Sequence, residues 1–177
     1  MPVYHDIADT LVIAPNFKKR LSGVTSTIVA LVPCQRAMGV KIAALAPEGL
    51  PASVPRVRFR DLWKMWKRPA DAKVRIWHAR RNTEMLPGII LRDALRMPLK
   101  LVFTSAAQRD HSGYTKWLIR RMDAVIATSS QAASYLQVPH SIIMHGIDTN
   151  RFVPPADKAA AKAVVGLDPA MKVFGCF

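Results

Sequence analysis

The feature that most constrains the fold is a series of short apolar runs separated by segments with helical character. Several of these runs are continuous rather than alternating, as expected for strands whose two faces are both covered. Strands are predicted at residues 10–15, 40–46, 57–60, 73–78, 99–105, 123–129 and 140–145. Since such strands are typical of parallel sheets flanked by helices, we predict an α/β fold: a Rossmann-like, doubly wound domain with a mainly parallel sheet.

Helix signals fill the segments between the strands. Helices are predicted at residues 23–39, 61–68, 82–97, 112–122, 130–137 and 154–166. The first begins after Ser22 and ends at Gly39, and Asn82 and Thr83 are the expected caps of the third. The segment 61–68, DLWKMWKR, places two tryptophans within about one helical turn of each other.

The stretch SIIMHGIDTNRFVPP, residues 141–155, reads as the junction between two domains. Glycine at position 146 lets the backbone leave the sheet, and Asp148 can cap a single turn. We expect His145, Gly146, Asp148 and Phe152 to form this junction. Residues 1–153 are then one Rossmann-like domain. Residues 154–177 are a linker helix and the first strand, at 171–177, of a truncated second domain.

The net charge of +14 is unevenly distributed along the chain. Residues 56–81 contain ten lysines and arginines against two aspartates. A field of one sign suits an anionic partner, although many charged segments only solubilise a surface. Because Trp63 and Trp66 lie among these cations, we expect residues 56–81 to contact an anionic membrane peripherally. A core-packed amphipathic helix would look similar.

Targeting and metal-binding signals are missing from this sequence. There is no secretory signal, and no apolar stretch approaches the roughly 18 residues of a membrane span. Cys34 and Cys176 form no motif and read as reduced thiols. We therefore expect a cytoplasmic protein, at most peripheral to the inner face of the cytoplasmic membrane. No metal site and no cofactor are expected, because the histidines lack ligand spacing and both nucleotide-binding fingerprints are missing.

Polar loops follow the predicted strands at the edge where open α/β sheets bind ligands. Ser22-Gly23 opens a helix and can hold a phosphate there, although a plain connection is an equal reading. In WHARRN, residues 77–82, adjacent arginines suit capture of an anion. In the loop 104–112, Asp110 and His111 suit proton transfer, although a hydrated surface is the simpler reading.

Together these segments resemble the N-terminal domain of GT-B glycosyltransferases of family 4. The resemblance rests on the Ser-Gly loop, the strand ends WHARRN and VFTS, the stretch RMDAVIATSSQAASYL, and above all IIMHGIDTNRFVPP. It covers essentially the whole chain. Among subfamilies, the lipopolysaccharide core mannosyltransferases are the most similar.

The resemblance implies a retaining, metal-independent transfer of a hexose, mannose from GDP-mannose, to an anionic lipopolysaccharide core glycolipid. It makes this chain the acceptor-binding half, inactive alone because the donor contacts lie in the other half. The implied roles are donor-phosphate loop for Ser22 and Gly23, acceptor binding for His78, Arg80, Arg81, Asn82 and Thr104, and catalysis for the candidates Ser105 and His111.

Two other classes of function remain open on the sequence. The charge alone suits a basic nucleic-acid-binding domain, and a non-catalytic domain that binds an anionic surface has the same composition. The chain lacks interleaved aromatic platforms and any nucleic-acid-binding motif, so no nucleic-acid partner is expected.

Overall fold

The computed structural model describes residues 2–18, 22–47, 49–149 and 152–174. The chain forms two compact units, Met1–Met144 and His145–Phe177. The second unit contains one described helix, α5 (Lys158–Val164), which begins at the Asp157 cap and is followed by Gly166 at φ 74°. In the described part of the chain, no helix has the length and apolar character needed to cross a bilayer.

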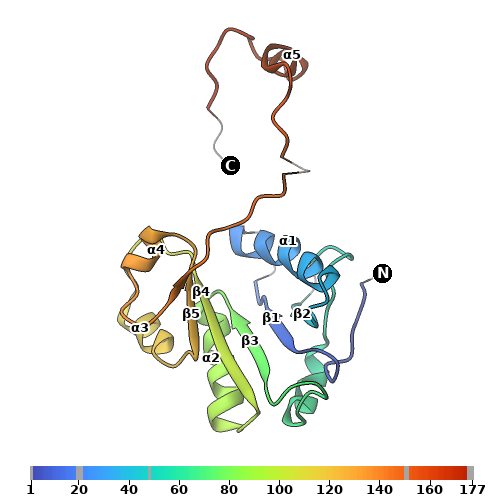
Figure 1. Cartoon of the computed structure of the whole chain (residues 1–177), viewed down its shortest axis with the longest axis vertical. Helices are drawn as coiled ribbons and strands as arrows, with labels where there is room; N and C mark the ends of the chain where they lie inside the picture. The colour runs from blue at the N-terminus through green and yellow to red at the C-terminus, as the bar shows by residue number, and fades with distance from the viewer. Residues whose placement is uncertain (1, 19–21, 48, 150–151, 175–177) are drawn as a thin grey trace. The chain divides into compact units, whose positions relative to one another are not determined.

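A six-stranded sheet organises the first unit (Figure 1), and every pairing in it is parallel. The strand order is β2-β1-β3-β4-β5-β6. The strands are β1 (Val12–Pro15), β2 (Ile42–Leu45), β3 (Arg75–Ala79), β4 (Leu99–Ser105), β5 (Ala124–Ala127) and β6 (Ser141–Ile142). The order reverses between β1 and β3, which is the doubly wound arrangement. The predicted fold class is confirmed.

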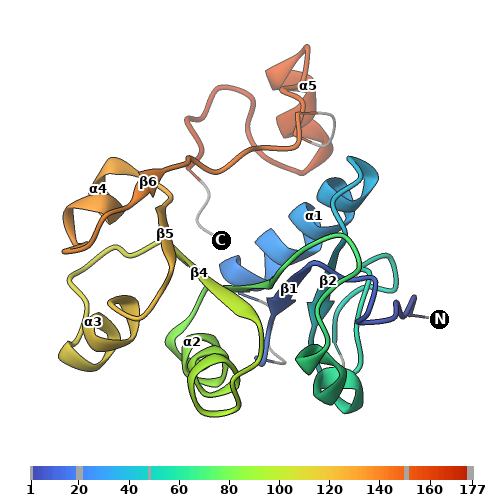
Figure 2. The same ribbon diagram turned by 60° about the horizontal axis from the view of Figure 1, so that its bottom comes forward.

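Helices cover both faces of this sheet (Figure 2). On one face lies α1 (Gly23–Ala37), and on the other lie the 3₁₀ helix η1 (Phe59–Trp66), α2 (Asn82–Ile89) and α3 (Gly113–Ile119). A short π-helical segment, η2 (Ile90–Ala94), extends α2, and α4 (Ser130–Ser134) connects β5 to β6.

Two hydrophobic cores result, one on each face of the sheet. Ile28 and Val32 of α1 pack with Ala14, Ile42 and Ala44. The larger core lies under α2 and α3 and contains the buried side chains of Ile13, Leu45, Trp77, Leu101 and Phe103. Consecutive residues of β1 and β2 thus belong to different cores, since side chains alternate across a strand. This explains why the sequences of these strands are apolar throughout.

Helix α2 lies directly against the indole of Trp77 at Gly88. A β-carbon at Gly88 would lie 2.6 Å from Cδ1 of Trp77 and 3.2 Å from Cδ2 of Leu101. The indole Nε1 also donates a hydrogen bond of 2.8 Å to the carbonyl of Glu84 in the first turn of α2. These contacts hold the start of α2 beside the end of β3.

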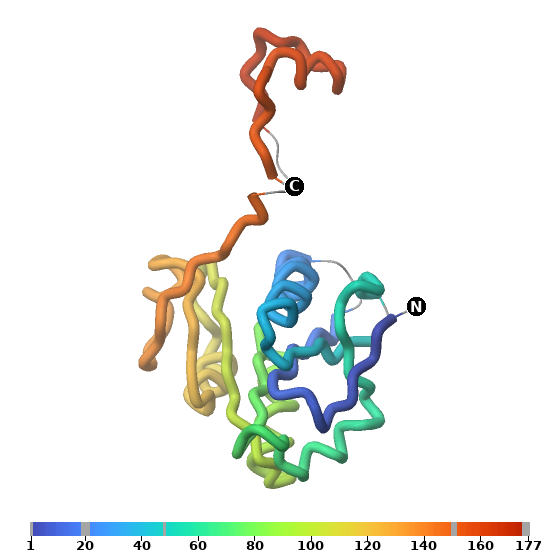
Figure 3. Tube along the Cα trace, turned by 45° about the vertical axis from the view of Figure 1, so that its right-hand side comes forward, coloured from blue at the N-terminus to red at the C-terminus, as the bar shows by residue number. Residues whose placement is uncertain are grey.

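The strand predicted at residues 57–60 is wrong. Arg56 forms only isolated bridges, with Tyr4 and Ala44, where the N-terminal segment runs beside the connection that follows β2 (Figure 3). The 3₁₀ helix η1 then begins at Phe59. Its three-residue period places Leu62 and Met65 on one side, packed against the core, which a strand would not allow.

Two further predictions concern the ends of elements. The strand predicted at 140–145 pairs only at Ser141–Ile142. For the predicted strand at 171–177, the described residues 171–174 form no strand, and residues 175–177 lie outside the described residues.

Part of the basic segment 56–81 points into the molecule. Arg56 and Arg75 are buried. The Arg75 guanidinium donates hydrogen bonds to backbone carbonyls of Ile7, Thr10, Met65 and Lys67. That of Arg56 donates to carbonyls of Leu50 and Pro51. These two charges therefore join loops together and do not belong to a membrane-facing surface.

Candidate functional site

The parallel sheet brings the carboxyl ends of its strands to one edge, the edge predicted to bind ligand. Strand β1 ends there at Pro15, β3 at Ala79 and β4 at Ser105. Helix α1 also begins at this edge, capped by the Ser22 side chain, which accepts a hydrogen bond of 3.4 Å from the Thr25 amide. We call the loops and side chains at this edge the rim.

Arg81 connects three parts of the rim. Its Nη2 donates to Ser22 Oγ at 2.7 Å and to Thr25 Oγ1 at 3.3 Å, at the start of α1. Its Nη1 donates to Asn16 Oδ1 at 2.7 Å, just after β1, and to Glu84 Oε1 at 2.8 Å, in α2. The guanidinium of Arg81 therefore ties the predicted donor-phosphate loop to the predicted acceptor loop, and the role that the geometry gives it is to position both.

Glu84 completes this network from a fully buried position. Its Oε2 accepts hydrogen bonds from the backbone amides of Arg80, at 2.8 Å, and Arg81, at 3.1 Å. Burial raises the pKa of the Glu84 carboxyl, and the Arg80 amide and the Arg81 guanidinium oppose that shift. The carboxylate thereby fixes the turn between β3 and α2 that carries both arginines.

His78 and Thr104 form a pair across β3 and β4. The imidazole Nε2 of His78 lies 2.7 Å from Thr104 Oγ1. Burial, and secondarily the positive charge of Arg80, lowers the pKa of His78 from 6.5 to about 3. At neutral pH the imidazole is therefore uncharged and offers one donor and one acceptor to the rim.

The low pKa of His78 predicts a pH dependence of stability. Between pH 6.5 and about 3, the unfolded chain binds a proton at this imidazole that the folded chain does not. The free energy of unfolding should therefore fall as pH decreases through this window, by up to about 1.4 kcal/mol per pH unit for one proton. Urea unfolding of the wild type and of His78→Gln from pH 4 to 7 measures the difference. Parallel pH profiles for the two proteins would contradict the prediction.

Of the two adjacent arginines, Arg80 has the guanidinium with fewer hydrogen bonds. Its one described side-chain hydrogen bond joins Nη1 to the His78 carbonyl at 3.5 Å. Burial lowers the pKa of the Arg80 guanidinium, with Glu84 opposing the shift. An arginine that is half-buried and weakly engaged retains donors for an anionic group, so this side chain fits the predicted anion capture better than Arg81 does.

Ser105 and His111 form a second pair, on the opposite face of the sheet from Thr104, because adjacent strand residues alternate. The Ser105 Oγ is buried and lies 3.2 Å from His111 Nε2. The His111 ring packs edge-on against Phe103. Burial lowers the pKa of His111, with the Asp110 carboxylate opposing the shift. The loop 106–112 thus places the His111 imidazole beside the end of β4.

An open hollow of about 980 Å³ lies beside this second pair. Its lining is mostly polar and comes from the start of α2, the loop before α3 and the first turn of α3: Asn82, Gln108, Arg109, Asp110, His111, Ser112 and Thr115, with Ala106 and Ala107. At the start of α1, a β-carbon added to Gly23 would meet no atom of the described residues within 4 Å. The rim therefore offers open space beside both predicted binding loops.

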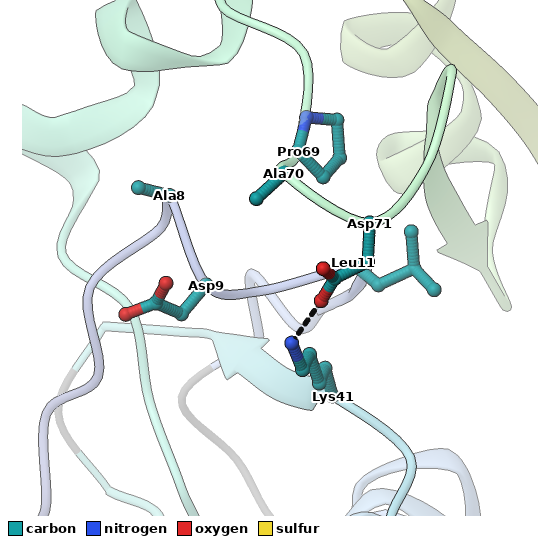
Figure 4. A pocket seen from close by; sticks show the side chains of 7 residues that line it. All are labelled: Ala8, Asp9, Leu11, Lys41, Pro69, Ala70 and Asp71. Atoms are coloured by element: carbon teal, nitrogen blue, oxygen red, sulfur yellow. Dashed lines mark hydrogen bonds and ion pairs between the residues drawn. The ribbon is translucent and has the colours of Figure 1, made fainter.

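A smaller pocket lies at the other edge of the sheet, and its lining contains none of the arginine and histidine side chains of the rim. Figure 4 shows it between the segment before β1 and the turn at Pro69–Asp71. Its one ion pair joins Lys41 to Asp71, and both side chains are largely exposed. We assign this pocket no role in binding.

The predicted junction residues lie in the second unit. The Phe152 amide donates to the Asp148 carbonyl at 2.9 Å. The predicted turn capped by Asp148 falls partly on residues 150–151, which lie outside the described residues. The Phe152 side chain is 63% exposed. That His145, Gly146, Asp148 and Phe152 form an interdomain junction remains a prediction.

Three rim residues were missing from the sequence-based site. Asn16, Thr25 and Glu84 are each buried and polar, and each hydrogen-bonds to Arg81. Glu84 carried a signal, because an acidic residue three positions after a helix cap is typical of a capping box. That spacing makes Arg81 the cap of α2, where Asn82 and Thr83 were expected.

The fold and the rim define a class: a doubly wound α/β domain with a candidate ligand-binding edge rich in arginine and histidine. Comparison with known proteins then gives relatives. The chain is 67% identical over 172 residues to the lipopolysaccharide core biosynthesis mannosyltransferase LpsB of Rhizobium meliloti (strain 1021), an alignment covering 97% of this chain and 49% of LpsB. It is 58% identical over 172 residues to LpcC of Rhizobium leguminosarum bv. viciae, of the same description, covering 97% and 48%.

The chain thus spans about half the length of the curated relatives it matches. No protein-family model matches the chain. No solved structure matches it. The predicted resemblance to lipopolysaccharide core mannosyltransferases is confirmed as a similarity over nearly the whole chain.

Proposed function

We propose that this chain is the acceptor-binding half of a GT-B glycosyltransferase of family 4. The whole protein would transfer mannose from GDP-mannose to a lipopolysaccharide core acceptor, with retention at the anomeric carbon. The observation that carries the proposal is the similarity over 97% of the chain to two proteins described as lipopolysaccharide core mannosyltransferases. The rim adds a physical basis for the binding of an anion and of sugar hydroxyls.

The donor side of the proposed site is the start of α1. A helix N-terminus attracts anions through its free amides and its dipole. Helix α1 has 15 residues, and the space beside Gly23 is open to a close approach. Because Arg81 and Ser22 hold this end of the helix in place, it can receive the donor diphosphate without rearrangement.

The acceptor side comprises His78, Arg80, Asn82 and Thr104, with Arg81 positioning the loop. Arg80 supplies the positive charge for an anionic core sugar, and the neutral His78–Thr104 pair supplies hydrogen bonds to sugar hydroxyls. Asn82 lines the open hollow and is exposed. This division gives the acceptor one charged contact and several neutral ones.

Ser105 and His111 are the candidates for handling the acceptor proton. In the transfer, the acceptor oxygen bonds to the anomeric carbon, and the bond from that carbon to the diphosphate breaks. The acceptor hydroxyl proton must leave in the process. Since the pKa of His111 is lowered, its imidazole is neutral at pH 7 and able to accept a proton or a hydrogen bond.

The second unit supports the proposal that the functional protein is longer. Several of its large apolar side chains are strongly exposed, among them Ile147 at 74%, Val164 at 86% and Phe174 at 94%. Such exposure is unusual for a finished surface and suits contact with a further domain. A second, donor-binding domain after the junction would provide it.

The proposed acceptor is a glycolipid, so the reaction takes place at a membrane. We propose a cytoplasmic protein that contacts the inner face of the cytoplasmic membrane peripherally, through the exposed residues of 56–81. Trp63 and Trp66 are 63% and 51% exposed, as such a contact requires.

Binding of delipidated lipopolysaccharide core oligosaccharide to this chain, measured by calorimetry, tests the proposed function. We expect Arg80→Ala to weaken binding about 10- to 150-fold, the value of one charge-assisted hydrogen bond of 1.5–3 kcal/mol. The matched control is Arg60→Ala, which removes an exposed arginine of η1 and should leave binding unchanged. Equal affinities of Arg80→Ala and wild type, or no binding by the wild type at millimolar oligosaccharide, would refute the proposal.

A further inference from the structure

Helix η1 presents an aromatic edge to solvent. In a 3₁₀ helix, residues three apart share a side, so Arg60, Trp63 and Trp66 lie together, on a different side from the buried Met65. Trp63 and Trp66 are more than half exposed. The Trp66 Nε1 donates to the Leu95 carbonyl at 2.7 Å, which fastens this edge to the turn after η2.

Helix α3 carries a second exposed aromatic group, on a part of the chain outside 56–81. The rings of Tyr114 and Trp117 are stacked, with centroids 6.2 Å apart. The Arg121 guanidinium lies 3.8 Å from the Trp117 ring centroid. Tyr114 is 50% exposed and Trp117 is 41% exposed. These rings do not contribute to either core.

Both aromatic groups belong to one helical layer. Helices η1, α2 and α3 lie on the same side of the sheet (Figure 2). Between the two groups, η2 and the following turn expose Ile90 at 47% and Leu95 at 42%. We call the exposed apolar side chains of this layer the outer layer surface: Trp63, Trp66, Ile90, Leu95, Tyr114 and Trp117.

The charges around the outer layer surface are mainly positive. Exposed cations flank it on η1 and its C-terminal turn, on the turn after η2, and at the end of α3: Arg60, Lys67, Arg68, Arg96, Arg120 and Arg121. The nearby aspartates are already paired, Asp61 with Lys64 and Asp93 with Arg92. Tryptophan and tyrosine among cations are typical of surfaces that lie in a membrane interface.

We propose that the outer layer surface docks on an anionic phospholipid bilayer, with η1 and α3 as two separate anchors. This inference rests on the proposed function, which requires a lipid-linked acceptor, and extends its membrane contact from residues 56–81 to α3. Two anchors on one layer fix the orientation of the domain on the membrane, which a single short helix would not. Each cation near the surface adds to the attraction through the negative surface potential of the anionic lipids and needs no specific contact.

Tryptophan fluorescence tests both anchors, because the chain has four tryptophans and one is an internal reference. Trp77 is only 1% exposed and should not be reached by lipid. The probes are vesicles of phosphatidylcholine with one-third phosphatidylglycerol, with and without bromine on the acyl chains. We expect bromine to quench the Trp63→Phe/Trp66→Phe variant, through Trp117, and also the Trp117→Phe variant. The variant lacking all three exposed tryptophans should show no quenching.

Charge variants test the attraction to anionic lipid. Arg121→Gln should weaken vesicle binding about five-fold, the value of one cation near such a surface. The matched control Lys158→Gln removes an exposed lysine from α5 and should have no effect. Binding of the delipidated oligosaccharide should be unchanged in Arg121→Gln, so a failure of docking is distinguishable from a failure of the proposed function.

Three outcomes would overturn the inference. The first is quenching that disappears in Trp63→Phe/Trp66→Phe, because α3 is then no anchor. The second is equal binding to vesicles with and without phosphatidylglycerol. The third is tighter binding to duplex DNA than to anionic vesicles at about 150 mM salt, which would assign the positive charge to nucleic acid instead.

Discussion

Replacing Glu84 with alanine is expected to lower the free energy of unfolding by about 3–5 kcal/mol. The Glu84 side chain is fully buried, and the guanidinium of Arg81 that faces it is 11% exposed. Removing the carboxylate leaves the positive charge of this guanidinium without its ion-pair partner. It also leaves the amides of Arg80 and Arg81 without their acceptor. Breaking a buried pair from one side costs far more than the pair contributes to stability when intact.

Urea unfolding followed by circular dichroism measures this loss. Glu84→Gln should cost less than Glu84→Ala, because the amide oxygen can still accept the two backbone hydrogen bonds. The control is Asp71→Ala, which breaks the exposed pair with Lys41 and should cost about 0–1 kcal/mol. If Glu84→Ala and Asp71→Ala cost the same, the buried network does not hold the rim together as described.

Much of the fold was predictable because its signals are local and repeated. Apolar strands such as 99–105 recur between capped helices, and that order leaves few topologies other than a parallel, doubly wound sheet. The segment 57–60 failed because its hydrophobic residues are too few to separate a period of two from a period of three. A period of three is present at Phe59, Leu62 and Met65. The burial of Met65 in the core favours this period over a strand.

The location of the site was predictable from the sequence, but the roles of the individual residues in it were not. Strand ends gave the positions of His78, Arg80 and Arg81, because parallel strands end at one edge. Sequence does not distinguish two adjacent arginines, however, and only the contacts show that Arg81 is engaged by Asn16 and Ser22 whereas Arg80 is not. In the same way, charge counts over 56–81 could not show that Arg75 is buried among carbonyls.

The second large effect concerns catalysis by this chain when it is joined to a donor-binding half. In a hybrid, this chain would replace the 172 matched residues of the Rhizobium meliloti relative, with which it shares 67% identity. The chain alone should show no turnover, because in the proposed enzyme the donor contacts that stabilise the leaving diphosphate lie in the donor-binding half. Even one missing charge-stabilising donor costs about 10²–10³ in rate.

Transfer of radiolabelled mannose from GDP-mannose to lipopolysaccharide core acceptor is the most direct measurement of the central claim. We predict that the hybrid transfers mannose, that the chain alone gives only background, and that Arg80→Ala in the hybrid impairs transfer while circular dichroism shows it folded. A folded hybrid that binds GDP-mannose but never labels the acceptor, or a chain that turns over GDP-mannose by itself, would contradict the assignment of this chain as the acceptor-binding half.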